Sequence, residues 1–190
     1  GGGGNLGFSN ITAPRTAGTY SPIDFNALIG QNNNQDGSAN VALRASHNDH
    51  DWLGVLSTYS TELSENFTLL AGLDLRTYEG RHYRTITDLL GAEYYVDARS
   101  DDNNPNKIVR VGDKYSYYND GKVSWLGGFA QLEYTQDKLS AFFSGSVSNT
   151  GYQRVDYFNY LDSDPNQTSA VQNFLGYQLK GGANYNLTDN

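Results

Sequence analysis

Tight turns and long connections alternate between long strand-like segments, and this order constrains the fold more than any other feature of the chain. The segments with at least partial alternation of apolar and polar residues are 51–63, 67–83, 123–134, 139–155 and 173–187. Short turns follow the first and third segments, whereas residues 84–122 and 156–172 form long connections. Such an order predicts an antiparallel sheet with hairpin turns at one end and elaborated loops at the other.

The length of the segments favours a membrane sheet. They contain 12 to 17 residues, whereas strands of soluble proteins usually have about 3–10 and a membrane-spanning strand needs roughly 9–11. In segment 67–83, Phe67 and Leu73 share one parity, and polar residues such as Asp74 take the other. The pattern recurs in 139–155 and 173–187, is weaker in 123–134, and is ambiguous in 51–63. We therefore predict an all-β fold, an antiparallel up-and-down transmembrane β-barrel segment with long extracellular loops.

The expected organisation is one partial β-barrel domain over residues 1–190. Residues 1–37 are loop-rich, with one or two helical turns capped by Ser21, and residues 38–190 hold about six strands, the sixth over 39–47. A further helical turn is expected over 86–91. Because the smallest outer-membrane barrels have eight strands, the strands near 39–47 and 173–187 are expected to lack partners within this chain.

Aromatic residues are concentrated at both ends of the strand segments. Phe67, Tyr134 and Tyr185 lie near the short turns on the apolar parity. Five others lie toward the long connections: Trp52, Tyr78, Trp125, Tyr152 and Tyr177. Two aromatic girdles around an apolar band are typical of membrane interfaces. However, three of the five have the polar parity, and tyrosine is also a good strand residue.

Composition narrows the class of protein. The formal net charge of -8 argues against nucleic-acid binding, which needs clustered Lys and Arg. Without cysteine, disulfide scaffolds and thiolate metal sites are excluded. The sequence contains no run of about 18 apolar residues, so it predicts no transmembrane helix. A secretory signal would precede an outer-membrane protein, and the chain opens on four glycines instead, so we expect a processed or excised piece.

Polar side chains on the parity that we assign to the barrel lumen are the candidate site residues. They are Asp74, Arg76, Gln131, Glu133 and Lys180. They would contact solute, water or a plug, or form an internal salt-bridge network that stiffens the wall. The sequence predicts no catalytic residues and no enzyme, because no phosphate loop, nucleophile elbow or zinc-protease motif occurs.

Two polar stretches resemble parts of metal sites. His47 and His50, with flanking acids, could ligate a divalent metal, although a solvated loop between two strands is the more common explanation. Asp162, Asp164 and Asn166 alternate as in a calcium loop but lack the glycine and glutamate of an EF-hand, so a turn is favoured. We expect no metal and no cofactor.

Several stretches carry a resemblance to a known family. They are 82–84 (HYR), 87–91 (TDLLG), 111–114 (VGDK), 117–121 (YYNDG), 131–134 (QLEY), 137–141 (DKLSA), 156–161 (DYFNYL) and 180–186 (KGGANYN). Together, over about residues 51–190, the chain resembles the barrel region of TonB-dependent receptors of the Bacteroidetes type. The resemblance implies a 22-stranded barrel in the bacterial outer membrane, plugged by an N-terminal domain, that imports a scarce nutrient with energy from the TonB complex.

Two functions from different classes follow. In the first, the chain is a wall segment of an outer-membrane importer. Its partners would be membrane lipid, the rest of the barrel and its plug, the TonB complex through segments that this sequence lacks, and a possible lid lipoprotein. In the second, it is a soluble β-sandwich carbohydrate-binding module that uses loop tyrosines. Those tyrosines are Tyr94, Tyr95, Tyr157 and Tyr160.

Overall fold

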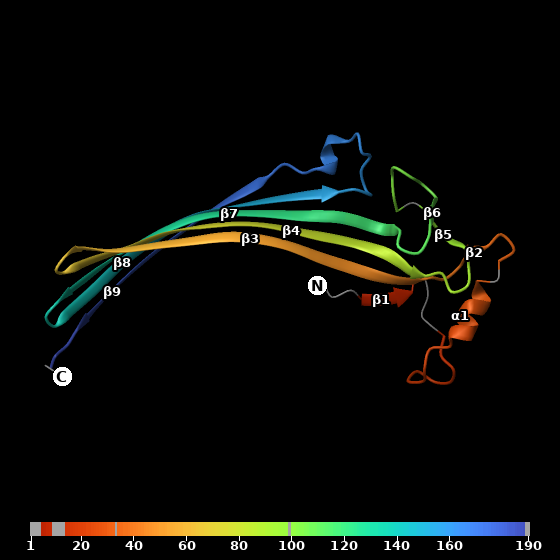
Figure 1. Cartoon of the computed structure of the whole chain (residues 1–190), viewed down its shortest axis with the longest axis horizontal. Helices are drawn as coiled ribbons and strands as arrows, with labels where there is room; N and C mark the ends of the chain where they lie inside the picture. Colours follow the sequence, from red (N-terminus) through yellow and green to blue (C-terminus); the bar gives the residue numbers. More distant parts are fainter. Residues whose placement is uncertain (1–4, 9–13, 33, 99, 189–190) are drawn as a thin grey trace. The chain divides into compact units, whose positions relative to one another are not determined.

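The protein is mostly β (Figure 1), and the computed structural model describes residues 5–8, 14–32, 34–98 and 100–188. The strands are β1 (Asn5–Phe8), β2 (Ser38–Ala39), β3 (Leu43–Ser64), β4 (Phe67–Asp88), β5 (Tyr94–Asp97), β6 (Lys107–Val109), β7 (Lys114–Gln136), β8 (Leu139–Asp156) and β9 (Gln172–Tyr185). They are accompanied by helix α1 (Phe25–Gln31) and the short 3₁₀ helix η1 (Pro165–Gln167).

The long strands form one six-stranded sheet in the order β1-β3-β4-β7-β8-β9, and a three-stranded sheet has the order β2-β5-β6. Strands β8 and β9 are antiparallel, with a register that runs from Leu139 opposite Tyr185 to Tyr152 opposite Gln172. In the described residues both sheets are open, and β9 is an edge strand. The structure thus confirms long antiparallel strands in a mostly-β chain.

The tight turns lie where the sequence predicts them. β3 and β4 are separated by two residues, and so are β7 and β8, where Asp137 has a φ of 50°, a left-handed conformation that aspartate tolerates better than most residues. The first long connection is shorter than 84–122, because β4 continues to Asp88 and β7 begins at Lys114. The helical turn predicted over 86–91 is therefore wrong. A tight turn with positive φ at Leu90 and Gly91 follows the strand instead.

Strand β3 runs without a break from Leu43, so the prediction of a separate strand over 39–47 followed by a solvated junction is also wrong. The polar run after Ser46 stays in the strand because three of its side chains are bound by side chains of β4. The pairs are His47 with Thr85 at 2.8 Å, Asn48 with His82 at 2.6 Å, and Asp49 with Tyr83 at 2.8 Å.

The edge of the sheet at the start of β3 is paired, contrary to the sequence-based expectation. Asn5 lies opposite Ser46 and Phe8 opposite Leu43, so β1 covers this short stretch. The expectation holds for β9, which has a single neighbouring strand among the described residues.

Helix α1 begins later than the sequence suggests. Its N-cap is Asp24, whose Oδ1 accepts a hydrogen bond from the Ala27 N–H at 3.0 Å. Ser21, the predicted cap, instead donates to the Gly18 carbonyl in the preceding turn. In the described part of the chain, no helix has the length and apolar character that a membrane crossing needs.

The chain divides into two compact units. The loop unit comprises Gly1–His50, Gly80–Gly121 and Arg154–Ser169, and the strand unit comprises Asp51–Glu79, Lys122–Gln153 and Ala170–Asn190. The loop unit holds the buried apolar core, in which Ile86 and Val109 are almost completely buried. The strand unit consists of the hairpin ends of the long strands together with β9.

A buried asparagine joins separate segments of the loop unit. Asn32 donates to the carbonyls of Val41 at 2.7 Å and Leu89 at 2.9 Å, and its Oδ1 accepts from the Val41 N–H at 2.9 Å. These bonds satisfy a polar side chain that would otherwise be costly to bury. They also fix the turn after β4 against the start of β3.

The two long connections contact each other in the loop unit. Asn103 Nδ2 donates to the carbonyl of Tyr160 at 3.0 Å, and Asn103 Oδ1 accepts from the Asp162 N–H at 2.7 Å. The Asp102 N–H donates to the Phe158 carbonyl at 2.8 Å. Both connections therefore emerge at one end of the sheet, as the alternation of turns and loops requires.

Asp156, at the end of β8, is buried and anchors the second connection. Burial raises the pKa of its carboxyl, but hydrogen bonds from the Asn159 side chain, the Asn159 N–H and the Phe158 N–H, together with the charge of Arg154, outweigh it. The net pKa lies below the ordinary value of 3.8. The carboxylate is thus stabilised in its charged form by the loop that it organises.

Candidate functional site

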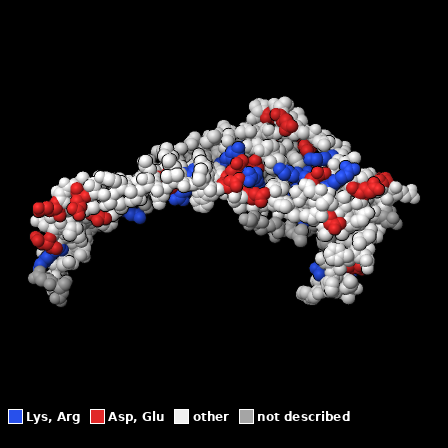
Figure 2. Space-filling model, in the orientation of Figure 1, with Lys and Arg blue, Asp and Glu red and all other residues white. Residues whose placement is uncertain are grey.

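One side of the strand unit, here called the apolar face, exposes large apolar side chains. Leu73, Phe143 and Leu179 are 57%, 59% and 68% exposed. On four strands, every second residue of a nine-residue run belongs to this face and is apolar or glycine; the runs are 67–75, 126–134, 139–147 and 177–185. In the view of Figure 2, charged side chains gather at the tight-turn end of this unit, whereas the strands beyond that end are mostly uncharged.

The apolar runs of β8 and β9 are aligned by the register of the sheet. Leu139 lies opposite Tyr185 at one end, and Val147 lies opposite Tyr177 at the other. Phe143 is the middle residue of its run and faces Gly181 across the pair. The two runs therefore form a continuous band rather than two staggered patches.

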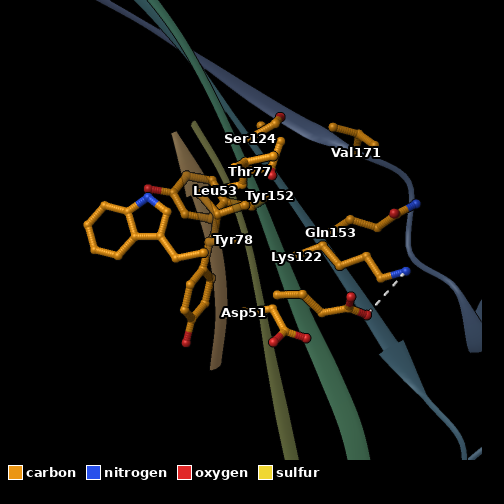
Figure 3. Close-up of a pocket in the computed structure, with 13 residues that line it drawn as sticks. Asp51, Leu53, Thr77, Tyr78, Lys122, Ser124, Tyr152, Gln153 and Val171 are labelled. Carbon is orange, nitrogen blue, oxygen red and sulfur yellow. Dashed lines mark ion pairs between the residues drawn. The ribbon is translucent and has the colours of Figure 1, made fainter. Parts of the chain in front are cut away.

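The apolar band ends in an aromatic pair on one side and in polar residues on the other. At the tight-turn end the rings of Phe67 and Tyr134 are in contact, with centroids 5.0 Å apart. At the other end the same parity becomes polar, and Lys122 Nζ lies 3.6 Å from Glu79 Oε1. This polar collar, which includes Thr77 and Gln153, lines a hollow of about 470 Å³ (Figure 3). In Figure 3 the side chain of Tyr78 points away from Lys122 and Gln153, toward the opposite side of the sheet.

The other side of the strand unit, the polar face, carries all five candidate residues from the sequence. Arg76 binds Asp74 through two hydrogen bonds of 2.8 and 2.6 Å, and Gln131 Nε2 donates to Glu133 Oε1 at 2.6 Å. Lys180 has no ion pair among the described residues. These hydrogen bonds join residues two apart on the same strand, so among the described residues they do not form the wall-stiffening salt-bridge network that the sequence left open.

Shallow hollows run along the polar face. Gln131 and Lys180 line one of about 310 Å³, and Asp74 lines one of about 290 Å³. Glu133 borders a third of about 460 Å³, and Arg76 a fourth of about 280 Å³. The structure thus brings the candidates to one surface, but spreads them along it rather than gathering them at one point.

Two aromatic residues that lie on the polar face, Phe129 and Phe142, cover glycines of the neighbouring strands. A Cβ on Gly72 would lie 2.5 Å from the ring of Phe129, and a Cβ on Gly182 would lie 2.8 Å from the ring of Phe142, its direct partner across β8 and β9. Each ring therefore occupies space that a side chain would otherwise fill. The sequence pattern alone did not predict this arrangement, although an out-of-pattern aromatic residue on one strand and a glycine on the next are its visible signal.

The aromatic residues near the long connections do not form the predicted girdle. Four of the five line the hollow of about 280 Å³ on the polar face beside Arg76, together with Thr150. They are Trp52, Tyr78, Trp125 and Tyr152. Only Tyr177 belongs to the apolar face, where it lies opposite Val147. In the sequence, three of these five aromatic residues already had the parity of the polar residues. The position of a residue along its strand, rather than its type, decides which face its side chain joins.

Neither metal-like stretch converges on a site. Among the residues that the structure describes, no group of three or more His, Asp or Glu side chains is placed to hold a metal ion. His47 stacks on Tyr83 at 4.6 Å. Asp164 caps η1 by accepting from the Asn166 N–H at 2.8 Å, and Asp162 accepts from Gln167. The second stretch is thus the turn that the sequence favoured.

Comparison with models of protein families, with curated proteins and with solved structures finds no match for this chain. The geometry of the two faces therefore carries the functional argument.

Proposed function

We propose that the strand unit is part of the wall of a β-barrel in the bacterial outer membrane, with the apolar face against lipid and the polar face toward the lumen. The observation that carries this proposal is the exposed apolar band, aligned across β8 and β9. Its runs of nine residues match the roughly 9–11 residues that a tilted strand needs to cross a membrane. Monomeric soluble proteins rarely expose so extensive an apolar surface.

The soluble carbohydrate-binding module has less support. Two of its four loop tyrosines are engaged within the loop unit, since Tyr95 packs against Tyr115 and Tyr157 stacks on Tyr118 with centroids 4.2 Å apart. A sandwich also needs a second sheet over the apolar side chains. In the described residues of the strand unit, large apolar side chains of these strands, such as Leu73 of β4, Phe143 of β8 and Leu179 of β9, are exposed instead.

Arginine substitutions on the two faces of β8 test the wall proposal. Phe143 is at the centre of the apolar band, so Phe143→Arg should destabilise the protein in phospholipid vesicles by about 2–4 kcal/mol, the cost at the bilayer midplane. Ser146→Arg is the matched control on the polar face, because it lies opposite the neutral Gln178 rather than opposite Lys180. Urea titration of both variants should show a lower midpoint for Phe143→Arg alone. Equal tolerance would refute the assignment of the faces.

We further propose that the barrel is a TonB-dependent receptor that imports a scarce nutrient. The sequence resemblance supports this proposal, as does a polar face with several shallow hollows. The edge of β9 that has no partner among the described residues would pair with another strand of the barrel, because unpaired backbone groups in lipid cost several kcal/mol each. A plug, the TonB complex and a lid lipoprotein are the partners of this proposal.

Growth tests in the source bacterium address import directly. A strain without the gene and a strain without TonB should share the same lost capacity for uptake across a panel of scarce nutrients. Retention of every tested uptake capacity in the gene-deletion strain, or a loss that does not require TonB, would contradict the importer proposal.

A further inference from the structure

The polar collar lies on the same face of the strand unit as the apolar band and begins where the band ends. On β4 this face continues from Leu75 to Thr77 and then to Glu79. On β7 it continues from Leu126 to Lys122. Residues two apart on a strand share a face. If the band spans the hydrocarbon layer, as the wall proposal requires, the collar lies at the depth of the lipid headgroups on the side of the long connections.

The hollow in the collar has the size of a small-molecule site and an apolar border. Its volume is about 470 Å³, within the roughly 300–1,000 Å³ of such sites. Gly151 of β8 is part of the lining, and a Cβ there would lie 2.7 Å from Ser124 Oγ, so the glycine leaves space that a side chain would fill. Two other lining side chains are apolar and exposed, Leu53 at 72% and Val171 at 49%. A polar hollow bordered in this way suits a polar group that is attached to an apolar chain.

Carboxylates outnumber cations in the lining. Among the described residues that line the hollow, Asp51 and Glu79 are the carboxylates and Lys122 is the cation. Lys122 and Glu79 form the ion pair drawn as a dashed line in Figure 3, and their side chains are 45% and 36% exposed. Such exposed pairs contribute little free energy, so the charges of a ligand can join them at low cost. The hollow therefore has net negative charge and also offers one cation to an anionic group.

A phosphoethanolamine headgroup matches these charges. Its primary ammonium has three N–H donors for the carboxylates of Asp51 and Glu79, and its phosphate can accept a hydrogen bond from Lys122. Hydrogen bonds between charged groups are the stronger kind. Ammonium and phosphate are neighbours in this headgroup, as the opposite charges are in the collar.

Two other common headgroups fit less well. Phosphocholine has the same charges, but its quaternary ammonium has no N–H to donate. Proteins hold quaternary ammonium groups against aromatic faces, whereas the ring of Tyr78 points to the opposite side of the sheet (Figure 3). Phosphoglycerol has a net negative charge and would meet two carboxylates with a single cation in the described lining.

We propose that the hollow in the polar collar binds the phosphoethanolamine headgroup of a membrane lipid, with the ammonium on Asp51 and Glu79 and the phosphate on Lys122. The proposal rests on the proposed function, because a lipid headgroup reaches the hollow only where the apolar face meets a bilayer. It makes this part of the wall selective for one class of lipid.

Photocrosslinking of the intact protein in vesicles tests the site. The vesicles contain equal parts of phosphatidylethanolamine, phosphatidylcholine and phosphatidylglycerol. Photoreactive benzoylphenylalanine replaces Leu53 at the border of the hollow, or Leu63, which is 58% exposed near the tight turn of the same strand. Mass spectrometry identifies the crosslinked lipids. We expect about fivefold enrichment of phosphatidylethanolamine over phosphatidylglycerol at position 53 alone, which corresponds to about 1 kcal/mol from two exposed ionic contacts.

Removal of the two carboxylates should invert the selection. Asp51→Asn/Glu79→Gln leaves Lys122 as the charge in the described lining, so phosphatidylglycerol should become the preferred lipid at position 53. Asp74→Asn/Glu133→Gln is the matched control, because it removes the same charge from the polar face and should keep the preference for phosphatidylethanolamine. Equal crosslinking of the three lipids at position 53, or a preference for phosphatidylethanolamine that survives in Asp51→Asn/Glu79→Gln, would overturn the proposal.

The same photoprobe at Leu179 separates this proposal from the wall proposal. Leu179 is 68% exposed in the apolar band, so in a membrane wall the probe should crosslink the acyl chains of all three lipids alike. Crosslinking at Leu179 without selection at Leu53 would leave the wall intact and reject the headgroup site. Absence of lipid crosslinks at Leu179 would reject the wall, and the headgroup site with it.

Discussion

Gly72 lies on β4 beneath the ring of Phe129, and its replacement by alanine tests how the polar face is packed. A Cβ at this position would lie 2.5 Å from two carbons of the Phe129 ring and 2.5 Å from the backbone oxygen of Ser57 on β3. Carbon atoms in contact are normally about 3.5–4.0 Å apart. The ring can swing aside, but the carbonyl can move only if β3 shifts against β4.

The expected free-energy change is a balance of two effects. Overpacking of this kind costs about 1–3 kcal/mol, whereas replacing a strand glycine by alanine normally gains about 0.5–1 kcal/mol. Gly72→Ala should therefore destabilise the protein by up to about 2.5 kcal/mol, and by about 1–3 kcal/mol relative to a glycine-to-alanine change without overpacking. Gly128→Ala is the matched control on β7, because its Cβ would make ordinary van der Waals contacts, with the end of the Leu73 side chain at 3.5 Å and with the Gly72 backbone oxygen at 3.8 Å. That variant should be at least as stable as the wild type.

Urea unfolding of the intact protein in vesicles provides the assay, with the midpoint compared at constant slope. The double variant Gly72→Ala/Phe129→Leu should recover only part of the loss, since the contact with the Ser57 carbonyl remains. If Gly72→Ala is as stable as Gly128→Ala, the close approach of β3 and the Phe129 ring to Gly72 does not exist, and our account of the out-of-pattern aromatics is wrong.

Three further outcomes are expected. Burial raises the pKa of Tyr115 to about 12, so the protein should lose stability as pH rises from about 10, where the unfolded tyrosine ionises, through about 12. Tyr115→Phe should remove that loss in alkaline unfolding titrations. Because the Tyr115 hydroxyl is buried without a hydrogen-bond partner among the described residues, the same variant should raise the free energy of unfolding by about 1–3 kcal/mol at pH 7. The folded-state pKa of Asp156 is lowered, so its contribution to the free energy of unfolding is present above the unfolded pKa of 3.8 and is lost as pH falls through the folded-state pKa. Asp156→Asn should be about 1–3 kcal/mol less stable than the wild type at pH 7, and this difference should shrink in acid unfolding titrations. Cysteines at the exposed loop positions Asn104 and Ser163 should both react with an impermeant thiol reagent on intact cells, whereas one in the tight turn at Glu65 should not; labelling of Glu65→Cys alone would invert the topology.

Local pattern was sufficient to locate the five long strands, although not all of their ends. Alternation with period two depends only on the geometry of one strand, and two-residue turns fix which strands are neighbours. The tight turns at Glu65 and Asp137, and the connection after Asp156, therefore follow from the sequence with errors of a residue or two. The same parity placed all five polar candidates on one face.

Contacts between distant segments decided the rest. The polar run at His47 stays in strand β3 because β4 supplies hydrogen-bond partners to it, and nothing in its local composition shows that. Asp24 rather than Ser21 caps α1, although both residue types are suitable, because Ser21 is held in the preceding turn.

Sequence alone determined which side chains share a face, because the alternation of a strand is a local property of the backbone. The tertiary structure decided what those faces contain. Neighbouring strands place Phe129 over Gly72, align the apolar runs of β8 and β9, and bring Trp52 of β3 and Tyr152 of β8 to the lining of one hollow. These arrangements depend on the register between strands, which is set by hydrogen bonds and packing among residues far apart in the chain.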